Sequence, residues 1–488
     1  MTQDTIQTFI DHIVSSPAPY TELDRQYVTN RILALIGEGS VPTAAANEPI
    51  DLVNALVQAA IDHGQIEDAP SPKDILEAQL MDLMTPLPSA LNRGFWDRYQ
   101  QSPSAATDWF YQLSQVNNYI KTRNIAKNVV FPAKTPAGEL EITINLSKPE
   151  KDPKAIAAAL TQKKTSYPLD QLCMTNEGYL GRLGYPARSN HRIVRMMLGG
   201  ETWGFQYSPY AYFSEHAIFL SQIHRPMVIN QHTFTNLLEI VRQLPTYFVG
   251  SNADLPIVGG SMLTHDHYQG GKHTFPMMKA PIDRSIDLGI AGVTAGVVQW
   301  PMTNIRLTGS QPEPLITAAT KVLNSWIDYS DEQVDVRAYT DGTRHHTITP
   351  IAYRQGDDYV LDLVLRDNQT STTYPDGIFH PHQDVQHIKK ENIGLIEVMG
   401  RAILPARLKT EMAEVEKYLL DQPNQMAAMH QAWADDLKQT NHVTAENVTA
   451  IVHEAIGNVF ARVLADAGVF KRTPTGQAAL DKFIAQIC

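Results

Sequence analysis

The first 125 residues carry apolar positions with the period of an α-helix. The stretch SPKDILEAQLMDLM (71–84) shows this period well, because three- and four-residue steps bring its apolar residues onto one face: Ile75, Leu76, Leu80, Leu83 and Met84. Ser71 is expected to cap this helix, Pro72 to occupy its first position and Asp74 to complete a capping box. The pattern predicts a helical N-terminal extension over residues 1–125.

From residue 126 onward the chain mixes strands with helices. In LEITINL (140–146) every second residue is apolar, which predicts a half-buried strand. Residues 344–368 predict a hairpin that turns at Gln355 to Asp358. A helix is expected over residues 444 to about 467, closed by Gly468. The long polar connection 371–387 is rich in histidine, and its length favours a functional loop.

A second amphipathic helix is expected over residues 232–245 (HTFTNLLEIVRQLP). Its apolar positions are Phe234, Leu237, Leu238 and Val241. Thr233 is expected to cap this helix and Pro245 to end it. Because the segment comes shortly before a histidine-rich strand, we expect the helix to pack beside that strand. The chain after residue 126 therefore mixes strands and helices, and the second half repeats this mixture loosely, so we expect an α+β fold.

Composition limits the classes of function. Of 488 residues, 40 are Lys or Arg and 52 are Asp or Glu, which gives a net charge of −12 and argues against a nucleic-acid-binding surface. Only two cysteines occur, Cys173 and Cys488, so we expect no disulfide framework and a reducing cytoplasm. The chain opens without a basic, apolar leader and has no 18-residue apolar run, so we expect no membrane segment.

Three polar side chains stand at every second position in SMLTHDHYQGG (261–271): His265, His267 and Gln269. On an extended strand they share one face. A neutral imidazole is a good nucleophile toward phosphorus. A histidine pair is equally a common metal-ligand set, but the amide of Gln269 is a poor ligand and a good donor to a phosphoryl oxygen. These residues therefore favour phosphoryl chemistry.

The segment before the histidines can hold phosphate oxygens. GSNADLPIVGGS (250–261) contains Asn252, the backbone N–H groups of Gly259 and Gly260, and Ser261. The predicted substrate-binding residues are therefore Asn252, Gly259, Gly260 and Ser261.

The stretch GSNADLPIVGGSMLTHDHYQGG (250–271) resembles the active-site segment of galactose-1-phosphate uridylyltransferases of the histidine-triad superfamily. The His-Asp-His-Tyr-Gln order and the helical extension are similar to the type 2 enzymes of Gram-positive bacteria. YPLDQLCMTN (167–176) and FSEHAIFL (213–220) are similar to motifs of the type 1 enzymes. The resemblance implies two histidine-triad-like halves, 126–310 and 311–488, with mainly antiparallel sheets and packed helices.

The resemblance also implies an activity. UMP would pass from UDP-glucose to galactose 1-phosphate in galactose metabolism, giving glucose 1-phosphate and UDP-galactose. His267 would be the nucleophile that carries UMP, the carbonyl of His265 would accept a hydrogen bond from its other ring nitrogen, and Gln269 would hold phosphoryl oxygens. The family further implies a homodimer.

Type 1 enzymes hold a structural zinc, and the positions that match its ligands here are Asp170, Cys173, His216 and His265. One thiolate of the family set is a carboxylate in this chain, which weakens the preference for zinc. We expect that no cofactor is required and that zinc is bound weakly or not at all. Two other functions stay open: a nucleotide hydrolase or phosphorylase of the same superfamily, and a non-catalytic metal-binding protein.

Overall fold

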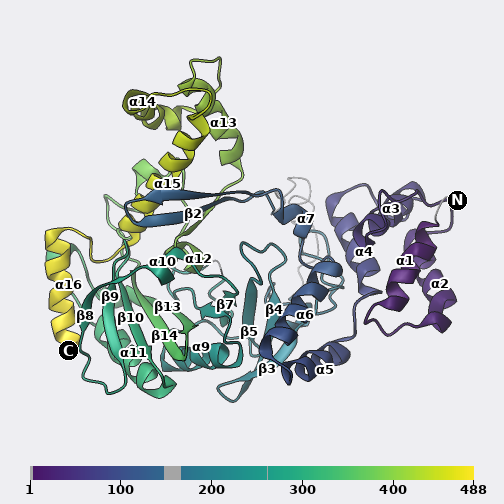
Figure 1. Cartoon of the computed structure of the whole chain (residues 1–488), viewed down its shortest axis with the longest axis horizontal. Helices are drawn as coiled ribbons and strands as arrows, with labels where there is room; N and C mark the ends of the chain where they lie inside the picture. The colour runs from purple at the N-terminus through teal and green to yellow at the C-terminus, as the bar shows by residue number, and fades with distance from the viewer. Residues whose placement is uncertain (1–3, 148–165, 261) are drawn as a thin grey trace. The chain divides into compact units, whose positions relative to one another are not determined.

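The computed structural model describes residues 4–147, 166–260 and 262–488, and it confirms a mixture of helices and mainly antiparallel sheet (Figure 1). The chain forms two compact units. The first comprises the described residues within 1–126, 148–211 and 215–224, and the second comprises 127–147, 212–214 and 225–488. These units follow from contacts between residues and do not test the predicted domain boundaries. The boundaries after residues 125 and 310 therefore stay a prediction.

The first unit begins with helices, as the sequence predicts. They are α1 (Thr5–Ser15), α2 (Arg25–Ile36), α3 (Pro49–Asp62), α4 (Pro70–Asp82), α5 (Pro88–Tyr99), α6 (Pro103–Val116) and the short α7 (Thr122–Ile125). The apolar faces of α1 to α4 enclose one core, to which Phe9, Ile32, Leu56 and Leu80 belong. Most of the stability of these helices comes from the apolar side chains that they bury against one another, away from water.

The start of α4 differs from the prediction. The helix begins at Pro70, its N-cap residue is Ala69, and Ser71 lies inside its first turn. Pro70 already supplies the fixed φ that suits a first helical position, so the earlier of two prolines starts the helix. The apolar face is as predicted for Leu76, Leu80, Leu83 and Met84, which are all buried.

The first unit also contains three antiparallel strands, β3 (Val194–Leu198), β4 (Glu201–Tyr207) and β5 (Ala217–Ser221). Helix α5 is fastened to β3, because the Asn92 amide donates to Ile193 O at 3.0 Å and accepts from Arg195 N at 2.7 Å. Aromatic rings of α5, α6 and β4 pack edge to face beside them, among them Phe95, Phe110 and Phe205. The last helices of the extension therefore share a core with these strands.

The second unit has a large antiparallel sheet. Seven of its strands pair in the order β7-β6-β13-β14-β10-β9-β8. Their bounds are β6 (Phe248–Gly250), β7 (His267–Gly271), β8 (Ile282–Ile286), β9 (Thr294–Val298), β10 (Asn304–Gly309), β13 (His346–Gln355) and β14 (Asp358–Asp367). Strands β13 and β14 form the predicted hairpin, because Gln355 pairs with Asp358 at the turn. Helices α9 (Gln231–Gln243) and α11 (Pro312–Ile327) pack against this sheet.

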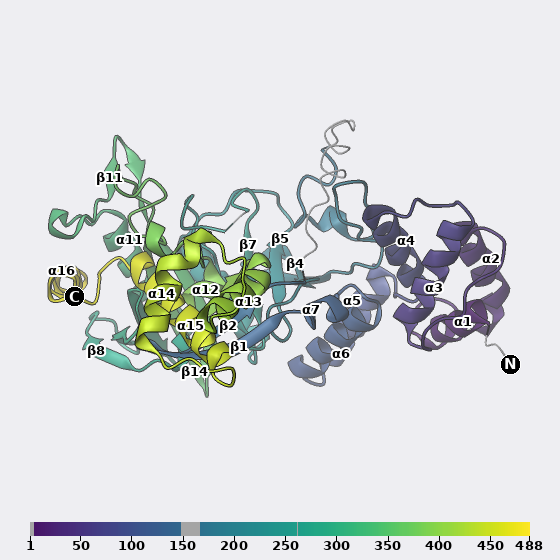
Figure 2. The same ribbon diagram turned by 90° about the horizontal axis from the view of Figure 1, so that it is seen from above.

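A smaller sheet and a group of helices complete the second unit. Strand β2 (Gly138–Ile144) pairs antiparallel with β1 (Val129–Thr135) and parallel with β15 (Arg401–Leu404). The remaining elements are α10 (Pro276–Lys279), α12 (Leu395–Val398), α13 (Arg407–Leu419), α14 (Gln431–Thr440), α15 (Val448–Ala467), α16 (Pro474–Ile487) and the short pair β11 (Tyr339–Thr340) and β12 (Thr343–Arg344). Figure 2 shows α13, α14 and α15 gathered beside β1 and β2.

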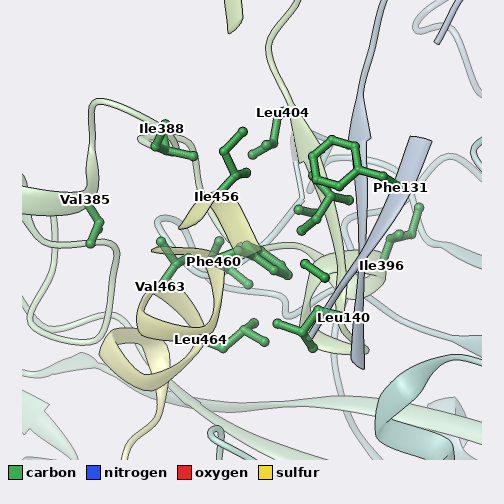
Figure 3. Packing of buried hydrophobic residues seen from close by; sticks show 14 of the residues in the cluster. Phe131, Leu140, Val385, Ile388, Ile396, Leu404, Ile456, Phe460, Val463 and Leu464 are labelled. Atoms are coloured by element: carbon green, nitrogen blue, oxygen red, sulfur yellow. The ribbon is translucent and has the colours of Figure 1, made fainter. Parts of the chain in front are cut away.

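The core of the second unit lies between β2 and α15. Leu140, Phe460 and Leu464 are fully buried there, together with residues of the large sheet such as Ile351 and Val364 (Figure 3). In the part of the chain that the structure describes, α15 is the one helix long and apolar enough to cross a membrane, and a core helix of a soluble protein passes the same test. Its buried residues belong to this core, which explains its apolar composition.

Two helix starts in this unit differ from the predictions. Helix α9 is capped by Asn230, whose side chain accepts from His232 N and Thr233 N, so the helix starts before the predicted cap at Thr233. Helix α15 starts at Val448 rather than at 444, while its end at Ala467 is as predicted. The four predicted apolar residues of α9 are all buried.

Candidate functional site

The predicted nucleophile lies at the start of β7, and its ring is fixed by one hydrogen bond. His267 is 6% exposed, and its Nδ1 lies 2.7 Å from the carbonyl oxygen of His265. Because a carbonyl oxygen can only accept, Nδ1 carries the proton and Nε2 keeps its lone pair. This is the arrangement that the family resemblance implies for a nucleophilic histidine.

The three predicted polar residues do not all lie on one strand. His265 stands in a bend before β7, which begins at His267, so only His267 and Gln269 share a strand face. Of the side chains between them, Tyr268 is 1% exposed, and its hydroxyl accepts from the Asn236 amide of α9 at 3.2 Å. Burial raises the pKa of the Tyr268 hydroxyl. Helix α9 therefore packs beside the histidine strand, as predicted, and contacts it through Tyr268.

Strand pairing places the start of the predicted phosphate-binding segment beside the strand that carries His267. Gly250 of β6 pairs with Gln269 of β7 in an antiparallel register. Asn252 follows the end of β6 by two residues, and His267 begins β7. Asn252 is 6% exposed, and its side-chain oxygen accepts from Leu395 N at 2.9 Å at the start of α12. The contact with α12 fixes the amide, which leaves its NH₂ group directed toward the glycine loop.

Asn252 and Ala253 lie so close to Gly260 and Gly259 that neither glycine position has room for a side chain. A Cβ at Gly260 would lie 2.7 Å from Asn252 Nδ2, and one at Gly259 would lie 2.5 Å from Ala253 O. Real side chains do not tolerate such distances, so both positions need glycine. Ser261, the remaining residue of the predicted set, lies outside the described residues.

Asp254 anchors this loop and was not predicted from the sequence. Its carboxylate accepts from Ile229 N at 3.0 Å, from Arg344 Nη2 at 3.0 Å and from Thr347 Oγ1 at 2.5 Å. These partners are separated from it by 25 to 93 positions in the chain. An isolated Asp in a loop gives no sequence signal for such a role, because its partners are brought in only by the fold.

A group of potential metal ligands lies in the first unit. The donor atoms of Asp170, Cys173 and His224 lie within 4.8 Å of one another. Carboxylate, thiolate and imidazole are all donors that zinc accepts. His265, also predicted as a ligand, belongs to the second unit.

His224 stands in this group where the sequence predicted His216. His216 immediately precedes β5 and is 3% exposed, whereas His224 follows the end of β5. The two histidines therefore lie beyond opposite ends of one strand, and the Nε2 of the later one lies 2.7 Å from Asp170 Oδ2. The motif likeness around FSEHAIFL selected His216, and the local sequence around His224 carries no comparable motif.

The Asp170 carboxylate already has protein partners. Its Oδ1 accepts from Leu172 N at 2.7 Å and Cys173 N at 3.0 Å, and its Oδ2 lies 2.7 Å from His224 Nε2. Burial raises the pKa of the Cys173 thiol to about 11. A metal ion would therefore have to displace a proton from this thiol.

Two histidines of the 371–387 connection take part in structural contacts. The His382 ring stacks on Tyr374 with centroids 4.1 Å apart, and its Nε2 lies 3.0 Å from Ile378 O. His380 is buried, and its Nε2 lies 3.3 Å from Asn392 Oδ1. Within the described residues, neither histidine belongs to a group of potential metal ligands.

Sequence comparison identifies matching family models over most of the chain. Residues 18–226 match the N-terminal domain of galactose-1-phosphate uridyl transferase, and residues 239–435 match its C-terminal domain. Proteins named galactose-1-phosphate uridylyltransferase are 72% identical over 483 residues in Pediococcus pentosaceus and 71% identical over 481 residues in Lactiplantibacillus plantarum. Each of these two alignments covers 99% of both chains.

More distant sequences and structures were also found. A relative of the same name from Streptococcus thermophilus is 56% identical and covers 99% of this chain and 98% of its own. Among solved structures, yeast Ap4A phosphorylase Apa2 aligns with a TM-score of 0.30 and 11% identity over 60% of this chain and 86% of its own. From the family models and the near full-length identities, we conclude that the chain belongs to the galactose-1-phosphate uridylyltransferase family.

Proposed function

We propose that the protein transfers UMP from UDP-glucose to galactose 1-phosphate through a covalent intermediate on His267. The observation that carries this proposal is the 2.7 Å hydrogen bond from His267 Nδ1 to the His265 carbonyl, in a chain of this family. In the neutral imidazole with its proton on Nδ1, the lone pair lies on Nε2, so the ring needs no separate base before it attacks phosphorus.

The proposed reaction has two displacement steps at phosphorus. In the first, His267 Nε2 forms a bond to the α-phosphorus of UDP-glucose, and the bond from that phosphorus to the bridging oxygen breaks. Glucose 1-phosphate leaves with the electron pair. In the second, a phosphate oxygen of galactose 1-phosphate attacks the same phosphorus and His267 leaves, giving UDP-galactose.

Three neighbouring groups support the transferred phosphoryl group in this proposal. The Gln269 amide would donate to an oxygen that gains negative charge in the transition state. The Asn252 NH₂ group and the backbone of Gly259 and Gly260 would hold the other oxygens. Because glucose 1-phosphate, the leaving group of the first step, is a phosphate that needs little protonation, an amide at position 269 suits transfer.

Exchange of label tests this function against the two alternatives. Labelled glucose 1-phosphate is incubated with unlabelled UDP-glucose in the absence of galactose 1-phosphate. A double-displacement transferase moves label into UDP-glucose, because its first step is reversible. A hydrolase would release UMP instead, and a non-catalytic protein would do neither.

We also propose that this reaction requires no metal ion, although Asp170, Cys173 and His224 could hold zinc, with His265 as the fourth ligand that the resemblance implies. The support is that both oxygens of the Asp170 carboxylate already have partners within the protein. A bound zinc would fasten the 170–173 loop and take no part in either displacement step.

We further propose a cytoplasmic homodimer that binds neither nucleic acid nor membrane. The net charge of −12 supports the exclusion of nucleic acid, because a phosphate backbone is repelled by an acidic surface. The dimer follows from the family resemblance. Light scattering of the purified protein, coupled to size-exclusion chromatography, measures the number of subunits directly.

A further inference from the structure

A cavity of about 1020 Å³ lies in the second unit and is not used by the proposed reaction. Its walls come from the turn between β1 and β2, the end of α10, the turn at 299–301, the last turns of α15 and the start of α16. None of His265, His267, Gln269, Asn252 or the two loop glycines lines it. The volume is at the upper end of the range for small-molecule sites.

Within the described residues, two lysines in this cavity have no carboxylate partner, whereas most of its carboxylates are paired. Two of its three carboxylates are neutralised by close partners: Glu141 lies 2.6 Å from Arg401 Nε, and Asp466 lies 2.7 Å from Arg462 Nε. Lys279 and Lys471 also line the cavity, and the hydrogen bonds of Lys471 go to backbone carbonyls rather than to a carboxylate. Glu139 is the third carboxylate.

The positive groups gather around the start of α16. Lys471 and Arg472 precede the helix, and Thr473 is its N-cap residue. Arg472 is already paired with Asp283 at 2.9 Å, so Lys471 is the cation available to a ligand at this end of the cavity. Lys471 Nζ donates to two carbonyls at the end of α15, Ala465 O at 3.0 Å and Asp466 O at 2.6 Å, which leaves its third N–H for a ligand. The partial positive charge of a helix N-terminus adds to these cations. Together they favour a dianionic group such as phosphate.

The rest of the lining suits a polyhydroxylated body. Gln299, Asn458 and Glu139 offer amide and carboxylate groups that can bind hydroxyls, and small apolar residues lie between them: Pro136, Ala137, Pro281, Pro301 and Ala461. A sugar presents hydroxyl groups around its ring and C–H groups on its faces, so it matches this mixture.

We propose that this cavity is a second, non-catalytic site that binds a sugar phosphate, with the phosphate near Lys279 and Lys471 and the hydroxyls near Gln299, Asn458 and Glu139. The site does not depend on the proposed chemistry at His267. The site would bind a compound of the same chemical class as the substrates, at a place separate from the site around His267.

Glucose 6-phosphate is a suitable probe, because its phosphate is not at the anomeric carbon and it is not the acceptor of the proposed reaction. Calorimetric titration of the full-length protein in saturating UDP-glucose should show binding of this probe. Lys279→Glu should weaken binding at least tenfold, and so should Ala461→Phe, which fills the cavity from α15. Lys409→Glu, on the exposed side of α13, is the matched control and should bind as the wild type does.

Transfer activity and circular dichroism show that each variant is folded. Absence of binding at millimolar probe would overturn the proposal, as would loss of binding when UDP-glucose is present. Equal affinity for inorganic phosphate would contradict the sugar part of the site. Equal affinity of the Lys279→Glu and Lys409→Glu variants would contradict its location.

Discussion

At the scale of single residues, the central feature is a histidine whose tautomer is set by its own neighbour. The carbonyl of His265 accepts from His267 Nδ1 at 2.7 Å, which leaves Nε2 as the atom that attacks phosphorus in the proposed reaction. A backbone carbonyl two residues away can do this because the chain bends at His265 before it enters β7. The same histidine that supplies this carbonyl is also a predicted metal ligand through its side chain.

Gln269→Ala should slow the formation of uridylyl-enzyme by roughly a hundredfold, the cost of losing one donor to a developing negative charge. The folding stability should change little, because the Gln269 side chain is only partly buried. Rapid-quench measurement of the first half-reaction gives this rate. Gln231→Ala, at an exposed position of α9, serves as the control. An unchanged rate in Gln269→Ala would assign this residue a structural role only.

Prolonged chelation should leave the transfer activity intact, because the Asp170 carboxylate is satisfied by protein groups. Elemental analysis of zinc in the purified protein accompanies this assay. If zinc is present, His224→Ala should lower its content and His216→Ala should not, because only His224 lies with Asp170 and Cys173. Stoichiometric zinc that is lost together with activity in Cys173→Ser would show that the metal is needed.

Residues near one another in the sequence could be predicted, and residues joined by the fold could not. The histidines, Gln269, Asn252 and the glycine pair lie within 18 positions of each other, so local spacing identifies them. His224 joins Asp170 across 54 positions, and Asp254 binds Thr347 across 93. No local pattern records such pairs, which is why the sequence pointed to neither His224 nor Asp254.

At the scale of elements, hydrophobic period predicts where helices and strands lie better than where they start. The apolar face of α9 and the hairpin of β13 and β14 are as predicted, because burial of alternate or helical positions dominates their energies. Helix starts depend on single hydrogen bonds of about 1 kcal/mol, so neighbouring polar residues compete for the cap. Asn230 rather than Thr233 caps α9 for this reason.

Helix α15 approaches β1 closely at Gly457, where a Cβ would lie 2.2 Å from the Cβ of Ala133. Gly→Ala in a helix normally stabilises by about 1 kcal/mol. Here overpacking reverses the sign, and we expect Gly457→Ala to lower the free energy of unfolding by about 1–2 kcal/mol. Chemical denaturation measures this change.

Gly94→Ala in α5 is the matched control for Gly457→Ala. It is also a helical glycine, but the nearest atom to its added Cβ, in the Trp109 ring, lies 3.1 Å away. Its effect should be clearly smaller. Stabilisation of the protein by Gly457→Ala would mean that α15 and β1 are farther apart than the structure describes.

At the scale of the whole molecule, two units of mixed helix and antiparallel sheet serve a nucleotidyltransferase of galactose metabolism. The N-terminal helices share a core with β3, β4 and β5, so they form part of a unit that also includes Asp170, Cys173 and His224. The proposed nucleophile His267, Gln269 and the glycine loop belong to the other unit. Sequence pattern could separate helical from mixed regions, but it could not predict which distant segments share a core.

Stability should decrease as the pH falls below about 6.5, the ordinary value for histidine. Burial lowers the pKa of His380, His387 and His453 in the folded protein. The pKa of His387 falls to about 4, because burial and the positive charges of His430 and Arg407 outweigh the opposite effect of Asp384 and Glu411. The unfolded chain then binds more protons than the folded one, so acid favours unfolding.

His387→Gln should therefore reduce the loss of stability between pH 7 and pH 5, measured as the shift of the urea midpoint. His442→Gln, at an exposed histidine, is the control and should keep the wild-type shift. The same loss in both variants would mean that His387 is protonated in the folded protein at pH 5.

The most direct test of the account is mass spectrometry of the protein after incubation with UDP-glucose and removal of small molecules. We expect one added uridylyl group, located on His267 by peptide fragmentation and discharged as UDP-galactose when galactose 1-phosphate is added. His267→Ala should form no adduct while its circular dichroism and unfolding midpoint stay close to those of the wild type. Rapid transfer with no adduct, or an adduct on another residue, would contradict the account.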